Sequence, residues 1–186
     1  MIEGALLAQD IELLKRVSKG DEEAFRQLYD LTHRKVYFYL YRLVHGRQMA
    51  EDILVETYTE VWRNASKFKG KSRAGTWIIG IARNLAMNQL RKVKVHEDID
   101  LIKNLSNGSQ PNGRPFDRKR VIKKALLTLS TKHQEVLDLV FFHGLTYQEV
   151  SEILGIPINT VKTRVFYAKE SLKQCLNQLG VKRDDL

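Results

Sequence analysis

Side chains suited to binding single-stranded nucleic acid are concentrated between residues 67 and 92. A basic loop comes first and includes Lys69, Lys71 and Arg73. The expected helix after it starts with an aromatic ring, Trp77, and then presents two amides and a further cation along one side: Asn84, Asn88 and Arg91. Cations pair with a phosphate backbone, rings stack on exposed bases, and amides bond base edges. Trp77 alone is also typical of a core residue, so the prediction rests on the combination.

A second group of candidate contacts lies between Tyr147 and Ser171, where the spacing is that of a helix-turn-helix motif. Gly155 permits a left-handed turn, and Val161 is expected in the shared core. The second helix leaves these side chains exposed: Lys162, Thr163, Arg164, Phe166, Tyr167 and Lys169. This set suits the DNA major groove, although an ordinary solvated helix face has a similar charge pattern.

An acidic stripe stands out in this otherwise basic chain. Asp52, Glu56 and Glu60 follow one another at four-residue steps, with Glu51 beside them. Like charges at that spacing repel one another, so a basic protein partner would explain them. A solvated helix face explains them equally well.

The residue types argue against catalysis. No nucleophile, base and orienting residue form a convincing set, the histidines are scattered, and Cys175 is the single cysteine. We therefore expect no enzyme activity, no metal and no cofactor. The net charge of +9 favours a polyanionic partner, nucleic acid first, although an anionic membrane or solubility could also account for it.

Residues that typically begin and end helices divide the first part of the chain into four expected helices. Asp10 is expected to cap a short helix that ends at Gly20, and Asp21 to cap a longer one that Gly46 closes. Ala24, Leu28 and Leu31 should share the buried face of the longer helix. A third helix is expected over about 49–65, with Leu54, Tyr58 and Val61 as its apolar stripe, and a fourth from Thr76 to about Lys92.

The pattern changes after Val93. Residues 104–115 are rich in Ser, Asn, Gly and Pro, which favours a flexible linker. Beyond it, caps for three helices are offered by Asp117, by Thr131 with Gln134, and by Thr146 with Glu149. We therefore expect an all-α chain with one helical domain over 1–93, a linker over 94–116 and a smaller helix-turn-helix domain over 117–186.

Three segments resemble, in order, those of extracytoplasmic-function (ECF) sigma factors of the sigma-70 family. Residues 50–63 are similar to the polymerase-binding helix of region 2, residues 76–92 to its promoter-melting and minus-ten-reading segment, and residues 145–172 to the minus-thirty-five-reading helix-turn-helix of region 4. The resemblance implies a subunit that directs bacterial RNA polymerase to promoters and initiates transcription.

The resemblance also implies roles for individual residues. Glu51, Asp52, Glu56, Tyr58 and Trp62 would bind the clamp helices of core polymerase. The minus-ten contacts would be Lys69, Lys71, Arg73, Trp77, Arg83, Asn84, Asn88 and Arg91, with Asn84 capturing a flipped base. The minus-thirty-five contacts would be Asn159, Thr160, Lys162, Thr163, Arg164, Phe166, Tyr167 and Lys169.

Partners and location follow from the same resemblance. We expect core RNA polymerase, with its clamp helices and flap, promoter DNA in duplex and single-stranded form, and an anti-sigma factor. No apolar run is long enough to cross a bilayer, and acidic Glu3 is unlike a secretory signal, so a cytoplasmic, nucleoid-associated protein is expected, one that an anti-sigma factor could hold at the membrane. The alternatives are a conventional helix-turn-helix regulator that binds an operator without polymerase and a nucleic-acid-processing enzyme.

This chain departs from the family pattern at a few positions. Val55 stands where the family often has glutamine, and Gly75, Gly80 and Asn88 replace residues that are commonly larger or, at the last position, acidic. The sequence therefore leaves the choice of minus-ten bases open.

Overall fold

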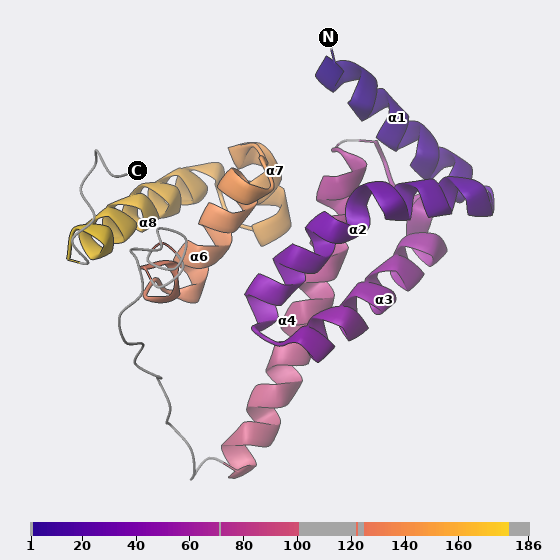
Figure 1. Ribbon diagram of the computed structural model, residues 1–186. Helices are drawn as coiled ribbons and strands as arrows, with labels where there is room; N and C mark the ends of the chain where they lie inside the picture. Colours follow the sequence, from indigo (N-terminus) through magenta and orange to yellow (C-terminus); the bar gives the residue numbers. More distant parts are fainter. Residues whose placement is uncertain (1, 71, 101–121, 123–124, 179–186) are drawn as a thin grey trace, which may run out of the picture. The chain divides into compact units, whose positions relative to one another are not determined.

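The computed structural model describes the backbone of residues 2–70, 72–100, 122 and 125–178, and every regular element within them is helical (Figure 1). The chain divides into two compact units. The N-terminal unit contains Met1–Val95, and the C-terminal unit is built mainly from residues after His96. The prediction of an all-α fold is confirmed. Asp117 and most of the predicted linker lie outside the described residues.

Helix α1 spans Ile2–Val17 and packs on α2, which spans Glu22–Val44. Asp10 lies inside α1, so the prediction that it caps this helix is wrong. The prediction for Asp21 is confirmed: its carboxylate accepts from the Ala24 N–H at 2.9 Å and from Arg16 Nε at 2.8 Å. Both bonds favour the charged form and lower the pKa of Asp21.

The buried face of α2 differs in one residue from the expected stripe. Ala24 and Leu28 are fully buried, but Leu31 is 52% exposed. Thr32 continues the stripe in its place, because its hydroxyl donates to the Leu28 carbonyl at 2.6 Å and so can be buried at little cost.

The turn after α2 also differs from the prediction. His45, at φ 54°, occupies the left-handed C-cap position, and its N–H donates to the Tyr41 carbonyl. Gly46, predicted to close α2, is instead the extended N-cap of α3, which spans Arg47–Asn64. Histidine is among the residues that tolerate this backbone region better than most.

Helix α3 packs on α2 and buries Ile53, Leu54 and Val61, and a short 3₁₀ turn, η1 (Ala65–Lys67), follows it. Helix α4 spans Ala74–Asp100. It begins before Thr76 and continues past Lys92 into residues predicted to be linker. No glycine or proline occurs between Val93 and Asp100, so nothing there forces the helix to end.

After residue 125 the described chain contains α6 (Thr131–Leu137), the π-helical turn η2 (Asp138–Phe142), α7 (Tyr147–Leu154) and α8 (Ile158–Gln178). Ser130, not the predicted Thr131, caps α6. The capping box of Thr146 and Glu149 is confirmed: the Thr146 N–H donates to Glu149 Oε2 at 2.9 Å, and the Glu149 N–H donates to Thr146 Oγ1 at 3.2 Å. Helices α6 and α8 pack together.

Candidate functional site

The basic loop between η1 and α4 is held by an aromatic pair. The rings of Phe68 and Trp77 lie 5.4 Å apart between centroids and are tilted by 52°, and both are half-buried. Gly70 adopts a φ of 66°, which turns the chain between them. Lys69 is exposed in this loop, whereas Lys71 lies outside the described residues. The loop thus presents a cation on a packed aromatic support.

One face of α4 carries the predicted minus-ten side chains. Trp77, Asn84, Asn88 and Arg91 are separated by seven, four and three residues, so they follow one helical stripe. Asn84, Asn88 and Arg91 are exposed. Ile78, Ala82 and Ala86 are buried. Arg73 and Arg83 are half-buried and already engaged within the protein. The stripe combines a ring, two amides and a cation on a rigid element.

The acidic stripe lies on the exposed side of α3. Glu51 pairs with Arg47 at 2.8 Å, and Asp52 accepts from Gln48 at 3.0 Å. Glu56 makes no hydrogen bond or ion pair with the part of the chain that the structure describes, and the neighbouring Val55 is 70% exposed. The centre of this face therefore offers a carboxylate beside an apolar side chain.

Tyr58 does not belong to that exposed face. Only 4% of it is exposed, and its hydroxyl lies 2.6 Å from Thr32 Oγ1. Because the Thr32 hydroxyl already donates to Leu28, the tyrosine O–H is the donor in this contact. Burial raises the pKa of Tyr58 above its ordinary range. The prediction that Tyr58 contacts polymerase is corrected: it supports α3 from beneath.

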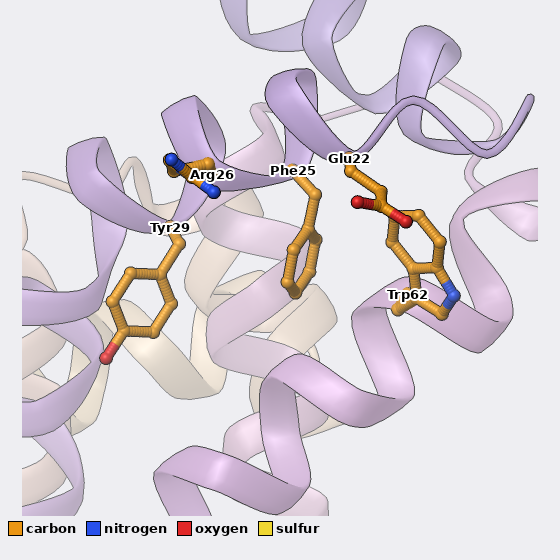
Figure 2. A pocket seen from close by; sticks show the side chains of 5 residues that line it. All are labelled: Glu22, Phe25, Arg26, Tyr29 and Trp62. Carbon is orange, nitrogen blue, oxygen red and sulfur yellow. The ribbon is translucent and has the colours of Figure 1, made fainter.

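Trp62 lies at the far end of α3 and forms one wall of an open groove of about 550 Å³. The other lining residues come from α2, and Figure 2 shows them: Glu22, Phe25, Arg26 and Tyr29. Phe25 packs edge-on against Trp62, with ring centroids 5.2 Å apart. The groove is lined by three aromatic rings, an acid and a cation, which suits a protein side chain better than a small ligand.

The helix-turn-helix residues adopt the expected positions. Gly155 turns at a φ of 64°, and Val161, Val165 and Ala168 are buried on α8. Phe166 and Tyr167 are both well exposed, at 60% and 57%. Asn159, Lys162, Thr163 and Lys169 are also exposed, while Thr160 and Arg164 are half-buried.

Two of these α8 side chains have partners within the unit. The Thr163 hydroxyl donates to the Asn159 carbonyl at 2.8 Å. The Lys169 ammonium lies over the Phe141 ring of η2, 5.5 Å from its centroid. Lys169 is thus positioned by an aromatic residue that the sequence reasoning did not single out.

The sequence reasoning also missed an aromatic cluster on α2. Phe38 and Tyr41 are 53% and 43% exposed, and both contact the ring of Tyr37. A count of exposed positions along α2 could have found them, but aromatic residues in a helix are assigned to the core by default. No group of side chains in the described residues could hold a metal ion, and no described helix is long and apolar enough to span a membrane.

Comparison with known proteins assigns both units. Residues 28–95 match the family described as Sigma-70 region 2, and residues 119–172 match Sigma-70, region 4. The chain is 30% identical over 179 residues to the ECF RNA polymerase sigma factor SigK of Mycobacterium tuberculosis, covering 92% of this chain and 96% of that protein. It is also 30% identical over 179 residues to the ECF RNA polymerase sigma factor SigW of Bacillus subtilis, covering 89% and 96%.

A solved structure agrees with these relatives. The sigma factor RpoE of Bartonella quintana, crystallised with the anti-sigma factor NepR, superposes with a TM-score of 0.69 at 27% identity. The match covers 82% of this chain and 96% of that one. The likeness extends over both units.

Proposed function

The chain belongs to the ECF RNA polymerase sigma factors of the sigma-70 family, and we propose that it directs bacterial RNA polymerase to specific promoters and initiates transcription there. The observation that carries the proposal is the pairing, in one unit, of an exposed amide-and-cation stripe on α4 with an exposed acidic face on α3. The first suits opened DNA and the second a basic protein surface.

Duplex recognition at the minus-thirty-five element is the proposed task of α8. Lys162, Thr163 and Arg164 lie in the second turn of α8. Lys162 and Arg164 can donate to phosphates and base edges in the major groove, and the Thr163 oxygen, whose hydrogen is donated to the Asn159 carbonyl, can accept. The exposed rings of Phe166 and Tyr167 offer apolar contact to thymine methyl groups. Asn159 and Thr160, at the start of the helix, complete the set.

Melting at the minus-ten element is the proposed task of α4 and the loop before it. Unstacking a base costs a few kcal/mol, and contacts to the flipped base recover roughly 1–3 kcal/mol. Asn84 is exposed, and its amide can bond the edge of such a base, while Lys69 and Arg91 can hold the strand. Binding energy drives this opening, so the mechanism needs no catalytic residue, no metal and no cofactor.

The acidic face of α3 is the proposed contact for the clamp helices of core polymerase. Asp52 and Glu56 supply charge, and Val55 and Trp62 supply apolar contact area. The polymerase flap is the proposed partner of the C-terminal unit. An anti-sigma factor that covers these surfaces would keep the protein inactive; RpoE of Bartonella quintana was crystallised with an anti-sigma factor. We place its action in the cytoplasm, at the nucleoid, with retention at the membrane if the anti-sigma factor is anchored there.

The experiment mixes the purified protein with bacterial core polymerase and a promoter library, and maps the transcript starts. We expect a stable complex and starts at a fixed distance from a shared two-part sequence. An operator-binding regulator would instead bind duplex DNA tightly without polymerase. Failure to form a complex at both low and moderate salt would overturn the proposal.

The double substitution Asp52→Ala, Glu56→Ala tests the polymerase contact. We expect it to weaken the complex and leave the helical circular dichroism unchanged, because both side chains are exposed. The matched control is Glu12→Ala plus Glu23→Ala, which removes two exposed carboxylates outside α3. Equal loss of polymerase binding in both variants would contradict a specific role for the α3 face.

A further inference from the structure

The stripe of side chains along α4 is interrupted at one position. Trp77 and Asn84 lie seven residues apart, which is two turns of helix and about 10 Å along the axis, whereas the later members of the stripe follow at intervals of four and three. Gly80 stands in the long interval, three residues after Trp77 and four before Asn84. By helical period it belongs to the same stripe, but it has no side chain. We call the space over this residue the Gly80 gap.

Within the described part of the protein, nothing requires a glycine at this position. Gly80 lies inside α4 and does not have a positive φ, so any L-residue could adopt its backbone conformation. A Cβ at residue 80 would have no heavy atom of the described chain within 4 Å, apart from its chain neighbours and the adjacent helix backbone. Gly80 therefore differs from Gly155, whose φ of 64° makes the turn of the helix-turn-helix.

A glycine in the middle of a helix has a cost. Relative to alanine it lowers the helix-forming equilibrium roughly fivefold, because its backbone is freer in the unfolded chain. Gly80 carries this cost without making a turn and without admitting another described element of the protein. Close approach of a ligand to the helix backbone is the remaining physical reason for a glycine at such a place.

The two side chains that border the Gly80 gap suit one unpaired base. Trp77 is half-buried, and its ring packs against Phe68 with 5.4 Å between centroids, so the ring is held in place. Asn84 is exposed, and its amide can both donate and accept. A ring stacks on the face of a base and an amide bonds its edge. With no side chain between Trp77 and Asn84, a base bound by both can lie against the helix backbone.

We propose that Gly80 is a specificity-determining residue of the minus-ten site: the gap over it seats one flipped base and, because residue 80 has no side chain, admits a two-ring purine there. This inference rests on the proposed function, in which α4 holds the opened strand. A larger residue at position 80 would leave room for a single-ring pyrimidine at most. The size of residue 80, and not a hydrogen bond that it makes, thus sets which class of base this position accepts.

The test compares a size series at position 80 in reconstituted holoenzyme. Core polymerase with the wild type, Gly80→Ala or Gly80→Leu transcribes a promoter library randomised across the minus-ten element, and the transcribed templates are sequenced. At one position we expect the wild type to accept purines and Gly80→Leu to lower the purine-to-pyrimidine ratio on the order of tenfold. Gly80→Ala should lower the ratio less, because one methyl group fills less of the gap. The affected position should be the one whose base preference also changes with Asn84→Ala.

Stability measurements separate a need for space from damage to the fold. Gly80→Ala and Gly80→Leu should each raise the urea midpoint of the full chain, because both residues form helices better than glycine. A variant that gains stability and rejects purines has not lost its function by unfolding. Gly75→Ala is the matched control, because Gly75 is also in α4 with no described heavy atom near its Cβ position, but lies roughly 140° around the axis from Gly80. It should leave the base preferences unchanged.

The outcomes also separate this inference from the proposed function. Equal losses of purine acceptance with Gly80→Ala and Gly80→Leu would show that the glycine supplies backbone freedom rather than space, and would overturn the inference. So would unchanged base preferences in both variants, or a wild type that rejects purines at the position that depends on Asn84; in either case promoter-specific transcription by the wild type would leave the proposed function intact. If the wild-type holoenzyme gives no starts from a shared two-part sequence, the proposed function itself fails, and the role of Gly80 fails with it.

Discussion

In the N-terminal unit the buried polar residues identified in the described part of the chain are threonines, whereas in the C-terminal unit they are acids. Thr32, Thr57 and Thr76 are buried in the first, and Glu135 and Asp138 in the second. Thr32 and Thr57 each donate to a carbonyl of their own helix, at 2.6 and 2.7 Å. A threonine satisfied in this way needs no other element, so its burial costs little.

The buried acids of the C-terminal unit depend on partners. Asp138, in η2, lies 3.2 Å from Nε2 of His143, and the two side chains are only 7% and 3% exposed. His143 follows η2 and precedes the capping box of α7. The contact between Asp138 and His143 thus lies at the entry to the helix-turn-helix. Among the described residues, a buried polar contact of the C-terminal unit thus needs a second side chain, whereas Thr32 and Thr57 of the N-terminal unit donate to carbonyls of their own helix.

The largest expected effect comes from Asp138→Ala. It removes one partner of a buried pair and leaves His143 buried without its carboxylate, which should cost on the order of 3 kcal/mol of unfolding free energy. Urea denaturation of the full chain, followed by circular dichroism, measures the change. Asp138→Asn is the matched control, because its amide oxygen can still accept from His143, and it should lose less. Equal losses of unfolding free energy in the two variants would show that the charged contact between Asp138 and His143 adds nothing to stability.

A second prediction compares the two DNA-binding faces. Asn84→Ala should reduce open-complex formation by about 30-fold, or about 2 kcal/mol, and affect initial duplex binding much less, because the amide acts on an unpaired base. Arg164→Ala should do the reverse. Stopped-flow fluorescence with holoenzyme and a promoter that carries a fluorescent minus-ten base resolves the two steps. Equal losses at both steps in either variant would break the proposed division between the units.

A third prediction concerns the neutral polar contact of the N-terminal unit. Tyr58→Phe removes the donor to Thr32 and should cost about 1 kcal/mol at neutral pH. Burial raises the pKa of Tyr58 in the folded state, so its contribution is complete below the ordinary value of about 10 and is lost as the pH rises above it. The wild type should therefore lose stability in alkali more steeply than Tyr58→Phe. Urea midpoints between pH 8 and about 11 measure the difference; parallel profiles would contradict it.

The helices and their faces were predictable where the pattern was local. Asp21 caps α2, Thr146 and Glu149 form their box, and Gly155 turns left-handed, because each needs only its neighbours in sequence. Predictions failed where two signals competed. His45, not the expected Gly46, occupies the C-cap of α2, and Ser130, not the expected Thr131, is the N-cap of α6. In each case the neighbouring residue could adopt the same conformation or make the same hydrogen bond.

The candidate site shows the same limit. Spacing alone placed Asn84, Asn88 and Arg91 on one face of α4, since a helical period determines that. Spacing did not separate Tyr58, which is buried, from Glu56, which is exposed, because their burial depends on how α3 packs on α2. The contact of Lys169 with Phe141 joins residues far apart in sequence and could not be read from either segment.

The smallest expected effect is that of Lys169→Ala. This variant tests whether the lysine that lies over Phe141 of η2 also contacts DNA, as we propose. The Lys169 ammonium lies over Phe141, so the substitution removes a cation–π contact and, on our proposal, one phosphate contact. Binding of holoenzyme to minus-thirty-five duplex DNA should weaken about threefold, and the slope of log affinity against log salt should fall by about 0.9. Lys173→Ala, which removes an exposed cation one turn further along α8, should change neither quantity. An unchanged slope with Lys169→Ala would mean that this lysine only covers Phe141, and the duplex contacts would then end at Tyr167.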